Sequence, residues 1–334
     1  MQAYRLTGAG LDALTRVEVA TPAPGPGEVL VRMRAMSLNS RDLSILAGHY
    51  PNKPDLQPLS DGAGLVEAVG AGVTDVGVGD AVTSCFYADW QSGPATAANH
   101  RLSLGCERDG VLAHYAVLPA TAVLPMPAHL SFAEAATLPC AALTAWSALF
   151  TEGKLLPGEQ VLIIGTGGVA LFALQFARLI GARAIMLSGD DARLERARSL
   201  GADHGINYRT TPDWATAVQA ATDGAGVDLV VELGGGGTLA QSLKCVRVGG
   251  RISLIGAIGG LEASVFVPDF LFRHIHLTGI TVGHRDDFRA MNAAIARHGL
   301  RPLIHARYDF DAAPAAYADM MRGGHFGKLV IETP

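Results

Sequence analysis

Charge of either sign is scarce in this sequence. Only 17% of its 334 residues are charged, and 26 Lys plus Arg stand against 31 Asp plus Glu with no basic cluster. Without a basic patch the chain offers no track for a nucleic acid or an acidic membrane surface. We therefore expect neither of them as a partner.

Cysteines and long apolar runs are also few. The four cysteines have no short pairing, which excludes a disulfide framework and is typical of reduced thiols. Residues 1–8 lack the features of a signal peptide, and the apolar stretch Leu171–Ala182 falls short of the roughly 20 residues that span a bilayer. These absences predict a cytoplasmic protein.

A mean hydropathy of +0.26 with so little charge indicates that some surface is covered by a second copy. The segment Ile252–Gly260, followed by Val265–Val267, is apolar enough to form an edge strand paired across such an interface. We therefore expect a homodimer.

The first third of the chain has the pattern of a β-rich domain. Short extended segments alternate there with Gly and Pro turns. The expected strands are Glu28–Met36, Gly62–Val69, Asp80–Ser84 and Ala113–Leu118. A chain of this length exceeds one hydrophobic core, so a second domain is expected.

From Ser131 onward helical segments appear, and then strands and helices alternate. Such repetition predicts a doubly wound parallel sheet. The expected strands are Gln160–Ile164, Arg183–Ser188, Gly205–Tyr208, Asp228–Leu233 and Arg251–Gly256, and the expected helices are Val169–Leu179, Arg193–Leu200, Trp214–Ala221 and Thr238–Val246. The tail, with a strand at Ile275–Val282, a helix at Phe288–Ala296 and a closing strand at Lys328–Ile331, is expected to complete the first domain.

A glycine turn between a buried strand and an amphipathic helix predicts a dinucleotide site. The turn reads Gly165-Thr166-Gly167-Gly168-Val169-Ala170. Gly165 permits the sharp turn, Gly167 lets backbone approach a pyrophosphate, and Ala170 keeps helix and strand close. The helix N-terminus then favours the anion.

The choice of cofactor depends on the end of the next strand, which holds Ser188 and no carboxylate. Arg193 could bind a 2′-phosphate with its forked donors, which favours NADPH over NADH. Asp190 and Asp191 leave an alternative open, as the acidic residue of an NAD site or as charge at a helix start. Arg193 could equally be a solvated helix residue, and Tyr208 a strand-end aromatic or a cofactor contact.

Five segments of the chain carry recognisable motifs. They are Ser37-Leu-Asn-Ser-Arg-Asp42, Ser60-Asp-Gly-Ala-Gly-Leu-Val-Glu-Ala-Val-Gly70, Ala135-Ala-Thr-Leu-Pro-Cys-Ala-Ala-Leu-Thr-Ala145, the Gly165 turn and His325-Phe-Gly-Lys-Leu-Val-Ile331. Together they resemble the medium-chain dehydrogenase/reductase superfamily, and most closely its zinc-free, quinone-oxidoreductase-like members. The resemblance implies an α/β fold in which a GroES-like catalytic domain is interrupted by a Rossmann domain. The expected division is 1–122 and 266–334 for the catalytic domain and 123–265 for the Rossmann domain.

Zinc-dependent relatives place Cys, His and Cys or Asp where this chain has Asn39, Ser60 and Cys140. One thiolate cannot make a three-ligand catalytic site, so no zinc is expected. His274 and His276 could alternate on a strand as metal ligands, or form a partly buried structural pair.

The resemblance also implies roles for individual residues. Asn39, Asp42 and Tyr50 are the candidate catalytic residues, and Tyr50 is the best side-chain proton donor, although solvent could do that work. Besides the glycine turn, the residues expected at the cofactor are Thr144, Ser188, Arg193, Tyr208, Ile255, Gly256, Val282, Gly283 and Lys328. Structural alternatives stay open, since Asn39 could cap a turn, Asp42 could charge a helix start, Tyr50 could anchor a loop and Lys328 could merely lie beside the final strand.

Without a Lewis acid, a quinone or an enone is an easier hydride acceptor than an unactivated ketone, because its reacting carbon is already electrophilic. The sequence therefore predicts an NADPH-dependent oxidoreductase that reduces a small-molecule quinone or α,β-unsaturated carbonyl by direct hydride transfer. The alternatives are a zinc-free alcohol dehydrogenase acting on activated alcohols and a protein that binds NADPH without turnover.

Overall fold

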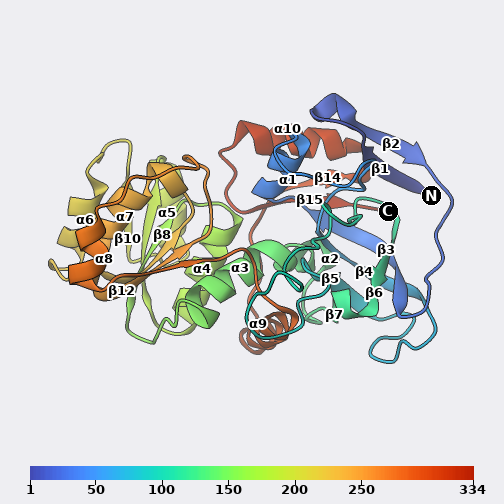
Figure 1. Ribbon diagram of the computed structural model, residues 1–334, viewed down its shortest axis with the longest axis horizontal. Coiled ribbons are helices and arrows are strands. Elements are labelled where there is room, and N and C mark those ends of the chain that lie inside the picture. Colours follow the sequence, from blue (N-terminus) through green and yellow to red (C-terminus); the bar gives the residue numbers. More distant parts are fainter. The chain divides into compact units, whose positions relative to one another are not determined.

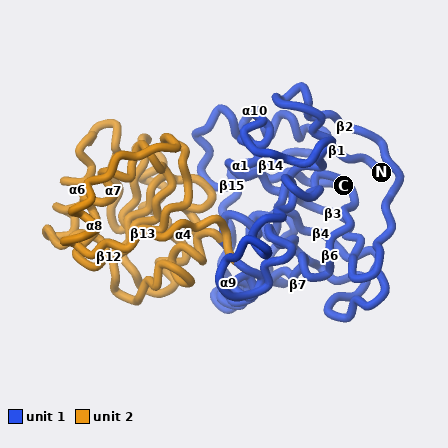
Figure 2. The backbone as a smooth tube through the Cα atoms, viewed as in Figure 1, with its two compact units in different colours: residues 1–143, 284–334 blue, residues 144–283 orange.

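The structure, a computed structural model, describes residues 1–334 as two compact units, coloured in Figure 2. Unit 1 comprises residues 1–143 and 284–334, and unit 2 comprises residues 144–283. The units change after residues 143 and 283, later in the chain than the expected boundaries after residues 122 and 265. The helical turns at 132–142 pack on strands of unit 1, and the strand at 276–279 pairs within the sheet of unit 2.

Unit 1 contains a seven-stranded sheet that is antiparallel except for one pair (Figure 1). Its order is β14-β15-β3-β4-β5-β7, with β6 also paired to β3. The strands are β3 (Glu28–Ser37), β4 (Asp61–Val69), β5 (Ala81–Ser84), β6 (Tyr115–Pro119), β7 (Val123–Pro125), β14 (Ile304–Asp309) and β15 (Lys328–Glu332), beside a hairpin of β1 (Gln2–Leu6) and β2 (Leu14–Glu18). Only the β14–β15 pair is parallel.

Unit 1 has four α-helices, of which α10 packs on α1 and on the β14–β15 pair. They are α1 (Ser40–Leu46), α2 (Phe132–Ala135), α9 (Arg285–His298) and α10 (Ala313–Arg322), with a π-helical turn η3 (Leu138–Ala142) and single turns η1 (Leu11–Ala13), η2 (Ala120–Ala122) and η6 (Phe310–Ala312). The core beneath them gathers apolar side chains such as Met33, Leu38 and Tyr317, each buried. The chain passes into unit 2 through α3 (Leu143–Trp146) and a second π-helical turn, η4 (Ser147–Thr151).

Unit 2 is a six-stranded sheet in which every pair is parallel, so the predicted Rossmann fold is confirmed. Its order is β10-β9-β8-β11-β12-β13, formed by β8 (Gln160–Ile164), β9 (Arg183–Ser188), β10 (His204–Asn207), β11 (Val227–Glu232), β12 (Val246–Leu254) and β13 (His276–Gly279). The helices are α4 (Gly168–Leu179), α5 (Asp191–Ser199), α6 (Trp214–Ala221), α7 (Leu239–Cys245) and α8 (Val267–Arg273), with a turn η5 (Gly235–Gly237). The central strands are buried on both faces, as continuous apolar runs such as Val161–Ile164 predict.

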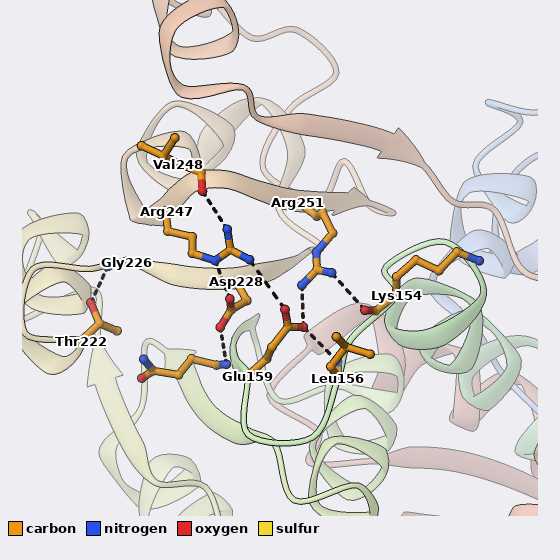
Figure 3. A network of polar contacts seen from close by, with 10 residues as sticks. Lys154, Leu156, Glu159, Thr222, Gly226, Asp228, Arg247, Val248 and Arg251 are labelled. Carbon is orange, nitrogen blue, oxygen red and sulfur yellow. Dashed lines mark hydrogen bonds and ion pairs between the residues drawn. The ribbon is translucent and has the colours of Figure 1, made fainter.

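At the amino ends of the central strands an ion-pair network joins three strands (Figure 3). Arg247 Nε donates to Asp228 Oδ1 at 2.5 Å, and Arg251 Nη2 donates to Glu159 Oε2 at 2.6 Å. Asp228 also accepts the Gln160 N–H at 2.8 Å. Ion pairs therefore connect the amino ends of these strands, whereas the predicted cofactor residues of unit 2 lie at the carboxyl ends.

Three sequence-based expectations about the late part of unit 2 differ from the structure. The segment 252–254 lies in β12, which has β11 on one side and β13 on the other, so it is an interior strand and the edge strands of the sheet are β10 and β13. His274 does not share a strand with His276, because it ends α8 in a left-handed conformation with φ 51°. The strand expected at 275–282 is β13, which belongs to unit 2 and does not complete the first domain.

Candidate functional site

The predicted cofactor residues of unit 2 lie at the carboxyl ends of its strands, which we call the cofactor edge. All six strands are parallel, so the loops after their carboxyl ends lie at the same edge, where doubly wound folds bind ligands. Those loops begin with Gly165 after β8, Gly189 after β9, Tyr208 after β10, Leu233 after β11 and Ile255 after β12. The strand order reverses between β8 and β11, and this reversal marks the crevice of the fold.

The Gly165 turn has the conformation that a pyrophosphate site needs. Gly165 has φ 92°, which side-chain-bearing residues rarely adopt, and its N–H donates to Leu187 O at 2.7 Å. α4 follows directly, and its N-cap Gly167 supplies no side-chain hydrogen bond to the first turn. The N–H groups of that turn are therefore available to an anion, which the helix dipole also favours. A dinucleotide fits this turn.

Two arginines, Arg193 in α5 and Arg209 after β10, lie near the end of β9. Arg193 Nε lies 3.7 Å from Asp190 Oδ2, and Asp190 caps α5 by accepting the Arg193 N–H at 2.9 Å. A β-carbon on Gly189 would lie 2.9 Å from Arg209 Nε and 2.7 Å from the Tyr208 hydroxyl oxygen, so both residues lie against this turn. The hydrogen bond from Arg193 N and the two guanidinium charges lower the pKa of Asp190. Sequence reasoning missed Arg209, although its place directly after the neighbouring parallel strand was a usable signal.

Asp191 has a different partner from Asp190. Its Oδ1 accepts the Asn207 side-chain N–H at 2.8 Å, which ties the start of α5 to the end of β10. Both aspartates therefore have local structural roles at the first turn of α5.

A buried polar cluster in unit 1 contains the predicted residues Asn39 and Asp42. Asn39 precedes α1, and its N–H donates to Asp42 Oδ2 at 2.7 Å in a capping box, as the structural alternative for both residues predicted. Lys328 is only 4% exposed, and its Nζ donates to Asn39 Oδ1 at 2.5 Å and to Leu38 O. The ammonium predicted to contact the cofactor thus has two oxygen partners inside unit 1.

Asp61, which the sequence analysis did not single out, joins the other members of this cluster. Its Oδ1 accepts the Ser60 hydroxyl at 2.7 Å and its Oδ2 accepts the Cys140 N–H at 3.0 Å. Burial raises the pKa of Asp61, and the charge of Lys328 opposes this rise. An aspartate at the start of an apolar strand was the signal that could have identified it.

The three positions that hold zinc ligands in related enzymes do come together around Asp61, but their donors do not fit a zinc ion. Cys140 is the only one of the three with a usual zinc ligand, and burial raises the pKa of its thiol to about 12, so the thiol would have to lose a proton to bind a metal. The Asn39 carbonyl oxygen is bound to the Lys328 ammonium, and the Ser60 hydroxyl donates to Asp61. No group of three or more His, Cys, Asp and Glu side chains is placed to hold a metal.

The remaining predicted residues occupy varied surroundings. Tyr50 lies in the loop after α1 and is 43% exposed. Thr144 is buried, and its hydroxyl donates to Thr281 O at 3.4 Å, which fixes the segment before Val282 and Gly283. The structure shows no hydrogen bond that would indicate a catalytic role for Tyr50 or Val282.

Asp42 makes the fold sensitive to pH. Burial raises its pKa from an ordinary value of 3.8 to about 6. The folded state therefore binds a proton that the unfolded state releases between these values, and the free energy of unfolding falls as pH rises through that window. Asp42→Asn should remove up to about 3 kcal/mol of this fall between pH 4 and 6, as the shift in pKa implies. Urea unfolding of both proteins across that window measures the difference, and parallel curves would contradict the prediction.

Comparisons with known proteins cover nearly the whole chain. Residues 25–128 match the alcohol dehydrogenase GroES-like domain, and residues 168–297 match the zinc-binding dehydrogenase family. A zinc-type alcohol dehydrogenase-like protein of Schizosaccharomyces pombe is 42% identical over 97% of this chain and 96% of its own length. A quinone oxidoreductase of Rattus norvegicus is 27% identical over 94% of this chain and 92% of its own.

Solved structures agree with these matches. The crystal structure of an NAD-dependent alcohol dehydrogenase superposes on this chain with a TM-score of 0.90 at 32% identity, and the match covers 100% of both chains. No helix of the chain is both long enough and apolar enough to cross a bilayer.

Proposed function

The chain belongs to the medium-chain dehydrogenase/reductase superfamily, whose members are NAD(P)H-dependent oxidoreductases, and from this premise we propose that it reduces a quinone or an α,β-unsaturated carbonyl with NADPH and without zinc. The observation that carries the proposal is the donor set of the unit 1 cluster. A neutral thiol, an amide and a hydroxyl stand there beside a buried ammonium. Asn and Ser are not usual zinc ligands and one thiol cannot make a three-ligand site, which favours an acceptor that is already electrophilic.

The residues of the chain would bind and orient the reactants. The bound dinucleotide supplies the hydride from C4 of its nicotinamide. The Gly165 turn holds the pyrophosphate through backbone N–H groups, and Arg193 with Arg209 holds the 2′-phosphate. Tyr50 is an exposed residue and is our candidate for the proton donor to the reduced acceptor.

A zinc-free alcohol dehydrogenase acting on activated alcohols is the second candidate. It is favoured by the alcohol-dehydrogenase names of many relatives and by the NAD-dependent enzyme whose structure matches over the full chain. The two candidates differ in the direction and the class of substrate, but both use the same cofactor edge.

One assay series separates these functions. Purified protein is first analysed for metal, and we expect zinc far below one ion per chain. It is then tested with quinones, enals, enones and alcohols, each with NADPH or NADP⁺ and with NADH or NAD⁺. Reduction of quinones or enones supports the proposal, whereas turnover of alcohols alone favours the second candidate. Tight NADPH binding with no turnover would indicate a non-catalytic binding protein, and stoichiometric zinc would refute the zinc-free mechanism.

We further propose that the protein is a homodimer formed through unit 2. Large apolar side chains are exposed around α8 and in the loop before it, among them Leu261, Phe266 and Phe272, which is 78% exposed. They lie close in sequence to β13, whose other edge has no partner. A second copy related by a two-fold axis could pair β13 with itself and cover this apolar surface.

Sedimentation tests the dimer. The unmodified protein should sediment with the mass of two chains, and Phe272→Glu should shift it towards one chain because a charge would be buried at the interface. A single-chain mass for the unmodified protein at all concentrations would contradict the proposal.

The four cysteines form no disulfide in the structure. Free thiols are typical of a reducing compartment, and on this ground we propose a cytoplasmic location.

A further inference from the structure

Glu232, the last residue of β11, is a fully buried carboxylate at the cofactor edge of unit 2. Its Oε1 accepts the N–H of Gly234 at 2.8 Å, the N–H of Gly235 at 3.0 Å and the hydroxyl of Thr238 at 2.5 Å. Its Oε2 accepts the hydroxyl of Ser242. Four donors from one glycine-rich loop and the helix after it thus converge on a single side chain.

The loop that Glu232 holds, residues 234–237, lies backbone to backbone on the loop after β12. Gly236 N–H donates to Gly260 O at 2.9 Å, and Gly259 N–H donates to Gly234 O at 2.7 Å. A β-carbon on Gly236 would lie 2.1 Å from Glu262 O, so no larger residue fits there. The main-chain oxygen of Glu232 also accepts the N–H of Ile255 at 2.9 Å. One residue therefore fixes both loops.

The two glycine loops at the cofactor edge therefore differ in the kind of group that they can bind. The Gly165 turn leaves the first N–H groups of α4 without a side-chain partner. The N–H groups of Gly234 and Gly235 are instead occupied by the Glu232 carboxylate, whose charge would also repel a phosphate. The loop at 234–237 is thus suited to the part of a dinucleotide that carries no phosphate charge.

The position of the loop identifies that part. β11 lies beside β8 but on the far side from β9, across the reversal of the strand order. If β8 and β9 serve the pyrophosphate and the adenosine half, the loops after β11 and β12 lie on the side of the other half, which is the ribose and nicotinamide.

We propose that Glu232 is a positioning residue of the cofactor site, which holds the loop at 234–237 in the shape that receives the nicotinamide-ribose half of the dinucleotide. This inference rests on the proposed function only in so far as the protein binds a nicotinamide dinucleotide. Glu232 does not touch the reacting atoms, and it acts through the backbone of Gly234 and Gly235.

The test compares binding of two ligands to matched variants. NADPH contains both halves of the dinucleotide, whereas adenosine 2′,5′-bisphosphate contains only the adenosine half. Glu232→Ala should raise the Kd of NADPH about tenfold, as expected if the loop keeps its bound shape only about a tenth of the time. The Kd of adenosine 2′,5′-bisphosphate should not change. Glu232→Gln should bind NADPH nearly as the unmodified protein does, because its amide oxygen can still accept from the loop and Ser242 can accept from its amide nitrogen.

Asp228→Ala is the matched control. Asp228 lies on the same strand as Glu232 and is also held by several donors, but at the amino end of the sheet (Figure 3). The Asp228→Ala variant should be less stable but should bind NADPH and adenosine 2′,5′-bisphosphate with unchanged Kd. This result would distinguish a general loss of structure from an effect on the cofactor site. If Glu232→Ala does not fold, Thr238→Val removes one donor to Oε1 and should raise the Kd of NADPH alone.

The outcomes distinguish the positioning role of Glu232 from the proposed function. An unchanged Kd of NADPH in folded Glu232→Ala, or an equal rise for both ligands, would overturn the positioning role. An unchanged Kd of NADPH in Thr238→Val would do the same if Glu232→Ala is unfolded. Failure of the unmodified protein to bind NADPH or NADH would instead refute the proposed function.

Discussion

Replacing Arg193 and Arg209 together by alanine should weaken NADPH binding on the order of 100-fold and leave NADH binding nearly unchanged. Each substitution removes a charge-assisted bond to the 2′-phosphate, worth roughly 1.5 to 3 kcal/mol. Arg193 is partly exposed and Arg209 is exposed, so the lower end applies. Two such losses amount to about 3 kcal/mol, or about two powers of ten in Kd. Titration of each cofactor by fluorescence measures the effect.

The same end of β9 offers a control and an opposing hypothesis. Arg183→Ala removes an exposed guanidinium from the amino end of the same strand and should change neither Kd. Asp190→Asn removes the carboxylate that lies beside Arg193 and should not weaken NADPH binding. If the double arginine variant loses both cofactors equally, the 2′-phosphate role is wrong. If Asp190→Asn weakens NADH alone, Asp190 is the carboxylate of an NAD site.

Lys328→Met should lower the free energy of unfolding by about 3 to 5 kcal/mol at pH 7, as is typical when one partner of a buried charge group is removed. Lys328 is 4% exposed, and its Nζ donates to Leu38 O and Asn39 Oδ1. Its charge also stabilises the buried carboxylates of Asp42 and Asp61. Methionine fills similar space but removes this cation, so that Arg41 alone still offsets the charge of Asp42. Chemical denaturation measures the loss.

Lys53→Met is the matched control for this variant. Lys53 pairs with Asp109, but its side chain is 42% exposed, so the expected loss is at most about 1 kcal/mol. Adding Asp61→Asn to Lys328→Met should recover part of the lost stability, because the second change removes a carboxylate that has lost its cation. Equal losses for Lys328→Met and Lys53→Met would show that the buried charge contributes no more than a surface pair.

Most secondary structure of unit 2 could be predicted because its signals are local. β9 and α6 match the predicted Arg183–Ser188 and Trp214–Ala221, and the turn at Gly165 joins β8 to α4 as predicted. Continuous apolar runs and helical spacing report burial of a segment wherever it packs. β14 and the β1–β2 hairpin were not predicted, because their short alternating segments resemble loops until their partners are known.

Domain boundaries and the exposed sheet edge depended on pairing, which is not local. The strand expected to complete the first domain became β13 of unit 2, since its register with β12 decides its place. The apolar segment expected at an edge became the interior strand β12 for the same reason.

The sequence alone determined the family, the dinucleotide turn at Gly165 and the substitution of Asn39 and Ser60 at positions that hold zinc ligands in related enzymes. These follow from residue identity and from spacing along one short segment. Only the tertiary structure showed that Lys328 binds Asn39, that Arg209 lies beside Gly189 and that Glu232 occupies the second glycine loop. The first two contacts join residues that lie far apart in the sequence, because burial and charge act through space. The Glu232 contacts are local in sequence, but they form only because the fold buries this carboxylate at the end of β11.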